Sequence, residues 1–395
     1  MTNLLDDLKS GPPENPKQRL GKLADLLETH NIDLSEIGKI DKIKVWQGFH
    51  KDEAGETQIV DLAGVVISPS WETGPEWPVV EPGPSYRLPK AGVKPITSDQ
   101  WESAVVLPDI QAGFYRAQDG TLVSTHDDQA IELAYSLIKA VRPSKVILVG
   151  DNLDLPDFST KYVVTPAFQQ TTQETINWTT RFCAQLRALA PEAEIVWLSG
   201  NHEERMPKWL AMNARAAFGL RRGLLSDEIP ERWPVLSVPY LCRMEEFGID
   251  YRPGYPAANV WITDRLKVIH GDKVKSNGST AHMYLSREKV SVIYGHIHRR
   301  EWAETTREDH DGSHTIMAAS PGCLAKINGA VPSFHQGLDL DGRPIVRHEN
   351  WQQGIAVVDY NTQDGRFNYN PVAFHREGST LWAKYSGKEY KVTYE

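Results

Sequence analysis

The sequence predicts an α/β protein in which a parallel β-sheet with flanking helices is followed by a second, partly antiparallel sheet. Two observations carry this prediction. Between residues 104 and 198, short apolar runs alternate with helical segments, which is the β-α-β-α-β order of parallel strands joined by right-handed crossovers. After residue 259, apolar runs follow one another without intervening helices, which favours a second sheet.

Length and composition bound the possible classes of protein. The 395 residues are 40% hydrophobic and 24% charged, as in an ordinary globular protein of one or two domains. No apolar run reaches membrane-spanning length, and the acidic first residues are not followed by an apolar signal region. Three widely spaced cysteines fit neither a disulfide framework nor a cysteine zinc site. We therefore expect a cytoplasmic protein with no membrane partner.

The formal net charge of −9 argues against a large, general nucleic-acid-binding surface. This charge still allows a local basic groove or a phosphate bridged by metal ions. The oligomeric state is left open by the sequence.

Residues 1–98 are expected to form an N-terminal accessory region. Leucines on one face predict a helix over residues 18–28, and Asp33 is placed to cap a short second helix. The two helices resemble half of a helix-turn-helix, although a helical hairpin docked on a larger domain is the more ordinary interpretation. Two short strands are predicted next, over residues 42–49 and 58–67. Seven prolines in residues 68–98 then predict an extended arm.

The main domain is predicted over residues 99–360, with a C-terminal β extension over residues 361–395. Its strands are short apolar runs, at residues 104–107, 145–149, 194–198, 260–262, 266–269, 290–294, 315–319 and 354–358. Helices are predicted over residues 126–141, with Thr125 as N-cap, and over residues 173–189. The remaining predictions are a loop over 155–172, irregular helical structure over 204–245, and a final edge strand over 388–394.

Side chains of the kinds that bind metal ions follow five of these strands. The carboxyl ends of strands are where α/β sheets bind their ligands. The side chains are Asp109 and Gln111, Asp151 and Asp154, Asn201 and His202, His270, and His296 and His298. A lone His is more often a surface or hydrogen-bonded core residue than a ligand, and an Asp at a strand end can be an ordinary turn residue. Five such strand ends in one chain are hard to obtain by chance.

In this order of motifs the sequence resembles the calcineurin-like metallophosphoesterase superfamily, over roughly residues 104–360. The resemblance implies two packed mixed β-sheets flanked by helices, an αββα sandwich, with two metal ions at the sheet ends. Four stretches are especially similar to metallophosphoesterases of bacteriophage and prophage genomes: residues 126–127, 158–159, 200–205 and 295–299. A phage-encoded protein of this kind would act in the cytoplasm of a bacterial host.

The resemblance also implies a role for each ligand-type residue. One metal ion would be held by Asp109, Gln111 and His298. The second would be held by Asn201, His270 and His296, and Asp151 would bridge both ions. His202 would be the catalytic general acid or transition-state stabiliser at the leaving oxygen, oriented by Asp154.

Gln111 departs from the family, most of which has a His at that position. A glutamine carbonyl is a weaker, neutral donor, which makes Mn²⁺ or Mg²⁺ relatively more plausible than tightly held Fe or Zn²⁺. The resemblance therefore implies two divalent ions, of which we expect Mn²⁺.

The expected reaction is hydrolysis of a phosphoester, a diester rather than a monoester, by attack of a metal-activated hydroxide on phosphorus. A nuclease and a phosphodiesterase for cyclic nucleotides or small molecules are both open. Arg205 and Arg299 follow metal motifs and are candidates to bind the substrate, with ion pairing to local carboxylates as an equal alternative. The alternative function is a nucleic-acid- or protein-binding module that keeps the fold with a weakened metal site, supported only by Gln111.

Overall fold

The computed structural model describes residues 37–51, 57–69, 100–161, 164–223, 232–276, 278–310, 312–327, 329 and 349–394. Contacts divide the chain into two compact units, Met1–Pro84 and Ser85–Glu395. In the first unit, β1 (Ile37–Lys51) pairs antiparallel with β2 (Thr57–Pro69), and these strands cover the two ranges predicted there. The predicted helical hairpin and residues 70–98 of the predicted arm lie outside the described residues.

A six-stranded sheet is the centre of the second unit, with the strand order β15-β14-β3-β6-β7-β8. Four of its strands run parallel: β3 (Trp101–Leu107), β6 (Lys145–Leu148), β7 (Glu194–Leu198) and β8 (Ile249–Arg252). β14 (Gly354–Asn361) runs antiparallel to β3, and β15 (Phe367–Ala373) runs antiparallel to β14. The first three parallel strands are those that the alternating pattern predicted.

A five-stranded sheet has the order β12-β13-β11-β10-β9. Its strands are β9 (Asn259–Thr263), β10 (Leu266–Ile269), β11 (Ser291–Tyr294), β12 (Arg300–Asp309) and β13 (Gly312–Pro321). The three central strands run parallel, while the edge strands β9 and β12 are antiparallel to their neighbours. The prediction of a second, partly antiparallel sheet is confirmed.

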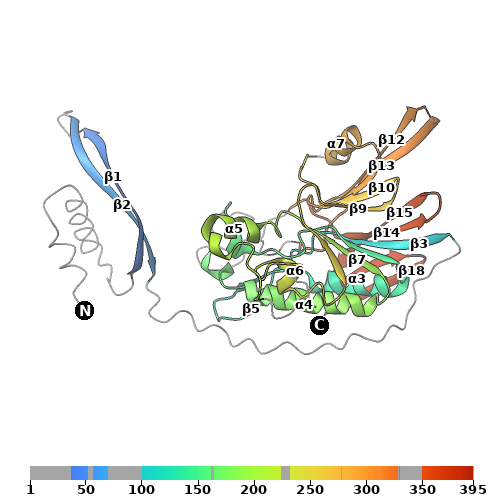
Figure 1. Ribbon diagram of the computed structural model, residues 1–395, viewed down its shortest axis with the longest axis horizontal. Helices are drawn as coiled ribbons and strands as arrows, with labels where there is room; N and C mark the ends of the chain where they lie inside the picture. Colours follow the sequence, from blue (N-terminus) through green and yellow to red (C-terminus); the bar gives the residue numbers. More distant parts are fainter. Residues whose placement is uncertain are drawn as a thin grey trace. The chain divides into compact units, whose positions relative to one another are not determined.

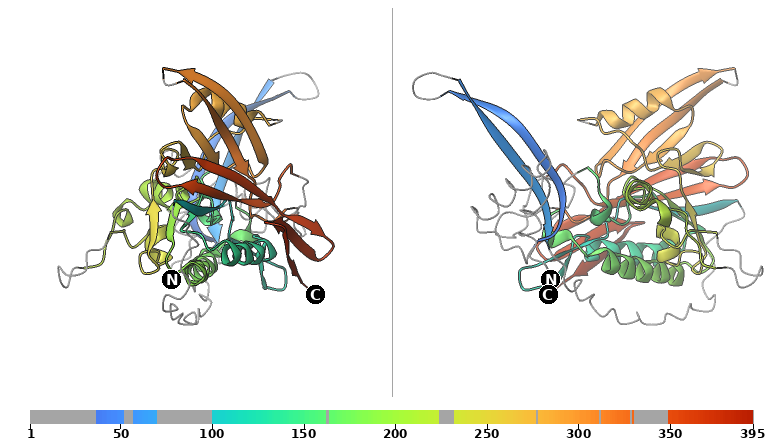
Figure 2. Two further views of the ribbon diagram at one scale, coloured as in Figure 1. Left: turned by 90° about the vertical axis from the view of Figure 1, so that its right-hand side faces the viewer. Right: turned by 60° about the vertical axis from the view of Figure 1, so that its left-hand side comes forward.

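Successive residues of a strand point to opposite faces of its sheet. One face of each large sheet packs against the other sheet. Val106 and Ile147 belong to the apolar cluster that also contains Val268 and Ile293 of the second sheet. The helices α3 (Asp128–Val141) and α4 (Thr172–Leu189) cover the other face of the six-stranded sheet. Helix α7 (Ser279–Arg287) covers the outer face of the five-stranded sheet. The layers are visible in Figure 1, and the views of Figure 2 agree. The second unit is thus two mixed sheets flanked by helices, as predicted.

Shorter elements connect and extend these layers. They are β4 (Phe114–Arg116), β5 (Leu122–Ser124), η2 (Pro156–Phe158), η3 (Pro166–Phe168), α5 (Arg205–Asn213), η4 (Arg215–Ala217) and α6 (Val238–Leu241). A three-stranded sheet closes the chain: β16 (His375–Glu377), β17 (Thr380–Tyr385) and β18 (Lys388–Thr393). The last two strands contact α3.

One local detail differs from the prediction. Asp127, not Thr125, caps α3, because its carboxylate accepts a hydrogen bond from the backbone N–H of Ala130 at 3.2 Å. The predicted final edge strand is present as β18, at the edge of the small third sheet, where it pairs with β17. Among the helices in the described part of the chain, none combines the length and apolar content needed to cross a membrane.

Candidate metal centre

The ligand-type side chains gather where strands of both large sheets end. Neighbouring parallel strands have their carboxyl ends at the same edge of a sheet, so residues that follow them are brought together. The strands β3, β6 and β7 are such neighbours in one sheet, and β10 and β11 in the other. They lead, in this order, to Asp109, Asp151, Asn201, His270 and His296.

The residues predicted for the first metal ion lie together. The Nε2 atom of His298 is 3.3 Å from Oδ1 of Asp109. The side-chain Nε2 of Gln111 is 3.4 Å from the same His298 nitrogen and 3.4 Å from Oδ2 of Asp151. Asp109, Gln111 and His298 are all buried, as is Asp151.

The residues predicted for the second metal ion form an adjoining group. The Nε2 atom of His270 is 3.3 Å from Oδ1 of Asn201 and 3.3 Å from Oδ2 of Asp151. Asp151, His270 and His296 each offer a ligand atom, and these atoms lie within 4.8 Å of one another. One oxygen of Asp151 therefore contacts a member of each predicted ligand set.

Several polar atoms of the site are buried without a hydrogen-bond partner, which is unusual in a folded protein. Among the described residues they include Oε1 of Gln111, Nδ1 of His296 and Nδ1 of His298. The two ends of an amide have the same shape, so a half turn of Gln111 brings its unpartnered oxygen to the place of Nε2. A cation between the ligands would give the Gln111 oxygen a partner, while His298 presents its other nitrogen, Nε2, to Asp109 and Gln111.

His270 has the second contact that metal-binding histidines usually have. Its Nδ1 atom lies 3.1 Å from the backbone carbonyl of Val149, which leaves Nε2 facing Asp151 and Asn201. The donors in both sets are carboxylate, amide and imidazole, without a thiolate. This chemistry fits Mn²⁺, Mg²⁺, Fe or Zn²⁺.

Backbone strain is concentrated in the predicted ligands. Five of the seven have a φ angle in the left-handed region, which residues other than glycine rarely adopt. They are Asp109 (φ 40°), Gln111 (56°), Asp151 (51°), His296 (69°) and His298 (56°). Strain of this kind persists where the surrounding structure holds a functional arrangement in place.

Glycines before the ligands allow the loops to approach closely. A Cβ atom at Gly200 would collide with the carboxylate and the backbone nitrogen of Asp151. A Cβ atom at Gly295 would lie 2.5 Å from Oδ2 of Asp109. The Gly-Asn and Gly-His pairs of the motifs therefore have a steric cause.

The charges of the site favour an ionised Asp151. Burial opposes ionisation, but the His202 and His270 rings hold the pKa of Asp151 well below its usual range. At His270 burial lowers the pKa, and the Asp151 carboxylate outweighs it and raises the pKa to about 9. Burial and the nearby His270 ring lower the pKa of His296 to about 4. Asp151 is thus held as a negatively charged carboxylate at the centre of the site.

Glu203 was not among the predicted site residues, yet it joins two of the ligand loops. Its buried carboxylate accepts hydrogen bonds from the backbone N–H groups of Asp151 (2.9 Å), Asn152 (2.9 Å) and Gly200 (2.8 Å). It also accepts one from the indole of Trp197 at 3.2 Å. Burial raises the pKa of Glu203, and the Asp151 charge raises it further. The motif Gly-Asn-His-Glu places a carboxylate here, but nothing local to it indicates these partners.

The predicted catalytic pair is also in contact. Nδ1 of His202 lies 2.9 Å from Oδ1 of Asp154, and both side chains are buried. The guanidinium of Arg205 contacts the same Asp154 oxygen and lies 2.8 Å from Nε2 of His202. Burial opposes ionisation of Asp154, but Arg205 and then His202 hold its pKa below the usual range.

Arg299 lies apart from this pair. Its guanidinium is 3.0 Å from Oε1 of Glu301, and it also donates to the backbone carbonyl of Lys275 at 2.5 Å. Ion pairing with a local carboxylate was the alternative to substrate binding in the sequence prediction, and this ion pair is present. A substrate contact by Arg299 stays a prediction.

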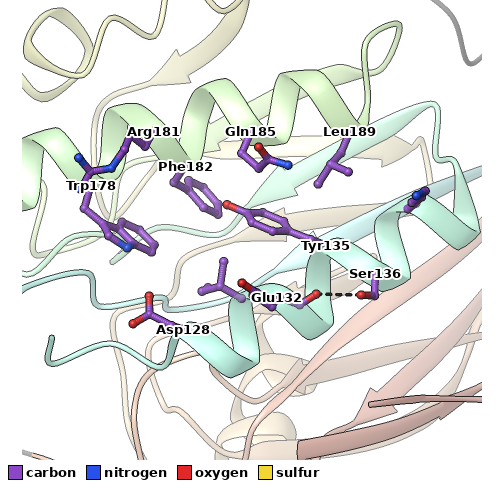
Figure 3. A pocket seen from close by; sticks show the side chains of 11 residues that line it. Asp128, Glu132, Tyr135, Ser136, Trp178, Arg181, Phe182, Gln185 and Leu189 are labelled. Carbon is purple, nitrogen blue, oxygen red and sulfur yellow. Dashed lines mark hydrogen bonds between the residues drawn. The ribbon is translucent and has the colours of Figure 1, made fainter. Parts of the chain in front are cut away.

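A separate hollow of about 540 Å³ lies between α3 and α4, on the outer side of the six-stranded sheet (Figure 3). Trp178, Phe182 and Tyr135 line it, with Arg181 and Glu132 at its polar part. The described residues that line it include none of the predicted metal ligands or catalytic residues.

Among the comparisons with known proteins, the matches are to solved structures. No protein-family model matches the chain, and no curated protein matches it. Eighteen chains of solved structures match. One is the crystal structure of Chaetomium thermophilum Vps29, with 11% sequence identity and a TM-score of 0.25, covering 74% of this chain and 94% of that one. A TM-score this low supports no inference, so the assignments below rest on the residues of this chain.

Proposed function

We propose that the chain is a calcineurin-like metallophosphoesterase that hydrolyses a phosphoester with the help of two divalent metal ions, Mn²⁺ by preference. One observation carries the proposal. Oδ2 of Asp151 lies 3.3 Å from His270, a ligand in one predicted set, and 3.4 Å from Gln111, a ligand in the other. A carboxylate shared in this way is what a two-metal site requires.

Asp151, His202 and Asp154 have different roles in the proposed reaction. Two bound divalent ions supply the positive charge that stabilises a phosphoryl group under attack and lowers the pKa of water. Oδ2 of Asp151 contacts a member of each ligand set. Nε2 of His202 lies 3.6 Å from Oδ2 of Asp151 and Nδ1 lies 2.9 Å from Oδ1 of Asp154. In the proposed reaction Asp154 would orient His202 toward the leaving oxygen.

The proposed substrate is a phosphodiester of a nucleotide, a nucleic-acid end or a small molecule. The net charge of −9 supports a small or single-ended substrate over a long duplex. A cytoplasmic location, of a bacterial host if the chain is phage-encoded, is part of the proposal. The three free, buried cysteines support it.

The test is hydrolysis of bis-p-nitrophenyl phosphate and of p-nitrophenyl phosphate by the full chain, with Mn²⁺, Mg²⁺, Ni²⁺ or Zn²⁺. We expect Mn²⁺-dependent turnover, faster on the diester. Asp151→Ala should lose both bound metal and activity, whereas Asp119→Ala, in an exposed turn, should keep both. Turnover of neither ester with any of the four ions would favour the binding-module alternative.

A second variant tests the role of His202. His202→Ala should keep the wild-type metal content, measured by elemental analysis, because His202 belongs to neither ligand set. Its turnover should fall by about 10²–10⁴, the usual contribution of general acid–base catalysis. Wild-type turnover in this variant would remove His202 from the mechanism.

A further inference from the structure

An aromatic ring lies against a histidine of each predicted ligand set. In one set, the centre of the Tyr255 ring lies 5.6 Å from the centre of the His270 ring, at an interplanar angle of 65°. In the other set, the ring centres of Trp351 and His298 are 4.2 Å apart, at an angle of 70°. The candidate metal centre thus has an aromatic neighbour at both of its ligand sets.

Both rings come from chain segments outside the ligand motifs. Tyr255 follows β8, and its backbone N–H donates to the hydroxyl of Ser199, which begins the loop after β7, at 3.1 Å. Trp351 precedes β14, and the adjoining Gln352 donates from its backbone N–H to the carbonyl of His298 at 2.9 Å. Backbone hydrogen bonds to the ligand loops therefore hold both rings beside the centre.

The two rings keep part of their surface open to solvent, since both residues are half-buried. Trp197, the tryptophan that donates to Glu203 within the site, is by contrast fully buried. Burial of an apolar ring is favourable, so packing against a histidine alone gives no reason for the exposed part. Exposed aromatic surface beside a phosphate-binding centre is suited to stack a planar group of the substrate.

The presence of one ring at each ligand set bears on the class of substrate. Phosphorus carries one organic group in a monoester and two in a diester. A cyclic nucleotide has two ester bonds but a single base. Two rings fit a diester with a planar group on each side of phosphorus, and a nucleoside supplies such a group because every base has a π-face on which an aromatic side chain can stack.

A positive charge accompanies the Tyr255 ring. Lys208 is exposed, and its ammonium lies 5.9 Å from the centre of that ring. It belongs to residues 205–222, which contain basic residues and no acidic one in a chain of net charge −9; the basic residues are Arg205, Lys208, Arg215, Arg221 and Arg222. A lysine beside a stacking ring suits the next phosphate of a nucleic-acid strand.

We propose that Tyr255 and Trp351 form two nucleoside subsites, one at each ligand set, and that the substrate is a phosphodiester joining two nucleosides, as in a dinucleotide or at the end of a single strand. This inference rests on the proposed function and names its substrate class, in place of a cyclic nucleotide or a small alkyl diester. Lys208 binds the phosphate next to the Tyr255 subsite.

The subsites are tested by binding rather than by turnover. The probes are thymidylyl-(3′→5′)-thymidine, dimethyl phosphate, which has the same charge and no base, and inorganic phosphate. Each is titrated calorimetrically into the full chain with Mn²⁺, in the slowed variant His202→Ala. The dinucleotide should bind more tightly than dimethyl phosphate. On this background Tyr255→Leu and Trp351→Leu should each weaken dinucleotide binding by about 5–100-fold, the usual contribution of one stacked base.

The same two leucine variants should leave the affinities for inorganic phosphate and for Mn²⁺ unchanged. Tyr255→Phe and Trp351→Phe keep a ring and should restore most of the dinucleotide affinity. The matched control is Trp101→Leu, which changes a partly exposed tryptophan at the start of β3, the end of the strand opposite Asp109, and should alter none of these affinities. Lys208→Met should weaken the binding of a dinucleotide with a terminal phosphate more than that of one without; an equal effect would remove Lys208 from the proposal.

Three results would overturn the two subsites. The first is a dinucleotide that binds no more tightly than dimethyl phosphate. The second is a 3′,5′-cyclic nucleotide that binds as tightly as the dinucleotide. The third is leucine variants that weaken Mn²⁺, inorganic phosphate and the dinucleotide alike, because the rings would then only pack against the ligand histidines.

Failure of the proposed function is a different result. If the chain binds neither inorganic phosphate nor dimethyl phosphate with Mn²⁺ and hydrolyses neither nitrophenyl ester, the proposed function fails and the subsites fail with it. If inorganic phosphate binds only with Mn²⁺ and the two bases add no affinity, the subsites alone fail.

Discussion

Replacing Glu203 by glutamine tests whether one buried carboxylate holds two ligand loops together. Each Glu203 oxygen accepts two hydrogen bonds: Oε2 from Asp151 and Gly200, and Oε1 from Asn152 and Trp197. Glutamine keeps the shape but exchanges one acceptor oxygen for an NH₂ group. Whichever way the amide turns, two N–H donors lose their acceptor.

The size of the effect follows from these two lost bonds. A hydrogen bond to a charged group contributes about 1.5–3 kcal/mol, so two give about 3–6 kcal/mol. Removing a buried charge that burial disfavours recovers part of this loss. We therefore expect Glu203→Gln to lower the free energy of unfolding by about 2 kcal/mol or more. The Mn²⁺ affinity should fall by about 10–100-fold, as for other residues that orient metal ligands.

Urea unfolding followed by tryptophan fluorescence, with and without Mn²⁺, measures the first quantity, and calorimetric titration with Mn²⁺ measures the second. The control is Glu204→Gln, since the neighbouring glutamate is less buried and should change stability by no more than about 0.5 kcal/mol. Wild-type stability and wild-type Mn²⁺ affinity in Glu203→Gln would refute the linking role of Glu203.

Three further predictions concern sterics, pH and thiol reactivity. Gly200→Ala should lower the free energy of unfolding in urea by about 1–3 kcal/mol because the added Cβ collides with Asp151. Gly223→Ala, with open space around it, should be near neutral, and equal effects of the two variants would contradict the steric explanation. The folded-state pKa of His270 is raised to about 9, so its contribution to the stability of metal-free protein is complete below about pH 6.5 and lost as pH rises through 9. Thermal unfolding in EDTA should show this loss, at most about 3 kcal/mol, and a flat profile would oppose it. Burial raises the pKa of all three thiols, so the native protein should resist alkylation at pH 8 and the unfolded protein should not; the thiols are Cys183, Cys242 and Cys323.

The sequence predicted the central strands because each contains a short apolar run, and in most of them both faces are buried. It did not predict β12 (Arg300–Asp309), because most of its residues are charged or polar and residues 300–308 alternate between exposed and half-buried. This edge strand is held by its hairpin pairing with β13, along its whole length, rather than by burial. Hydrophobic periodicity cannot detect a strand of this kind.

The site was predictable to the extent that its residues follow strand ends. That Asp151 and His270 would meet was implied by the family resemblance, because they follow strands of two different sheets; in the structure their ligand atoms lie within 4.8 Å of each other. The role of Glu203 was not predictable, because its acceptor atoms meet donors from two different loops and a tryptophan. The partners of Arg205 and Arg299 were equally hidden. A long flexible side chain reaches whichever carboxylate the tertiary structure brings near, here Asp154 and Glu301.

Anomalous diffraction from crystals grown with Mn²⁺ tests the two-metal site most directly. We expect two manganese peaks about 3.5–4 Å apart, with the Asp151 carboxylate between them. One peak should be ligated by Asp109 and His298, and the other by His270 and His296. A single peak, or none at saturating Mn²⁺, would contradict the proposed dinuclear centre.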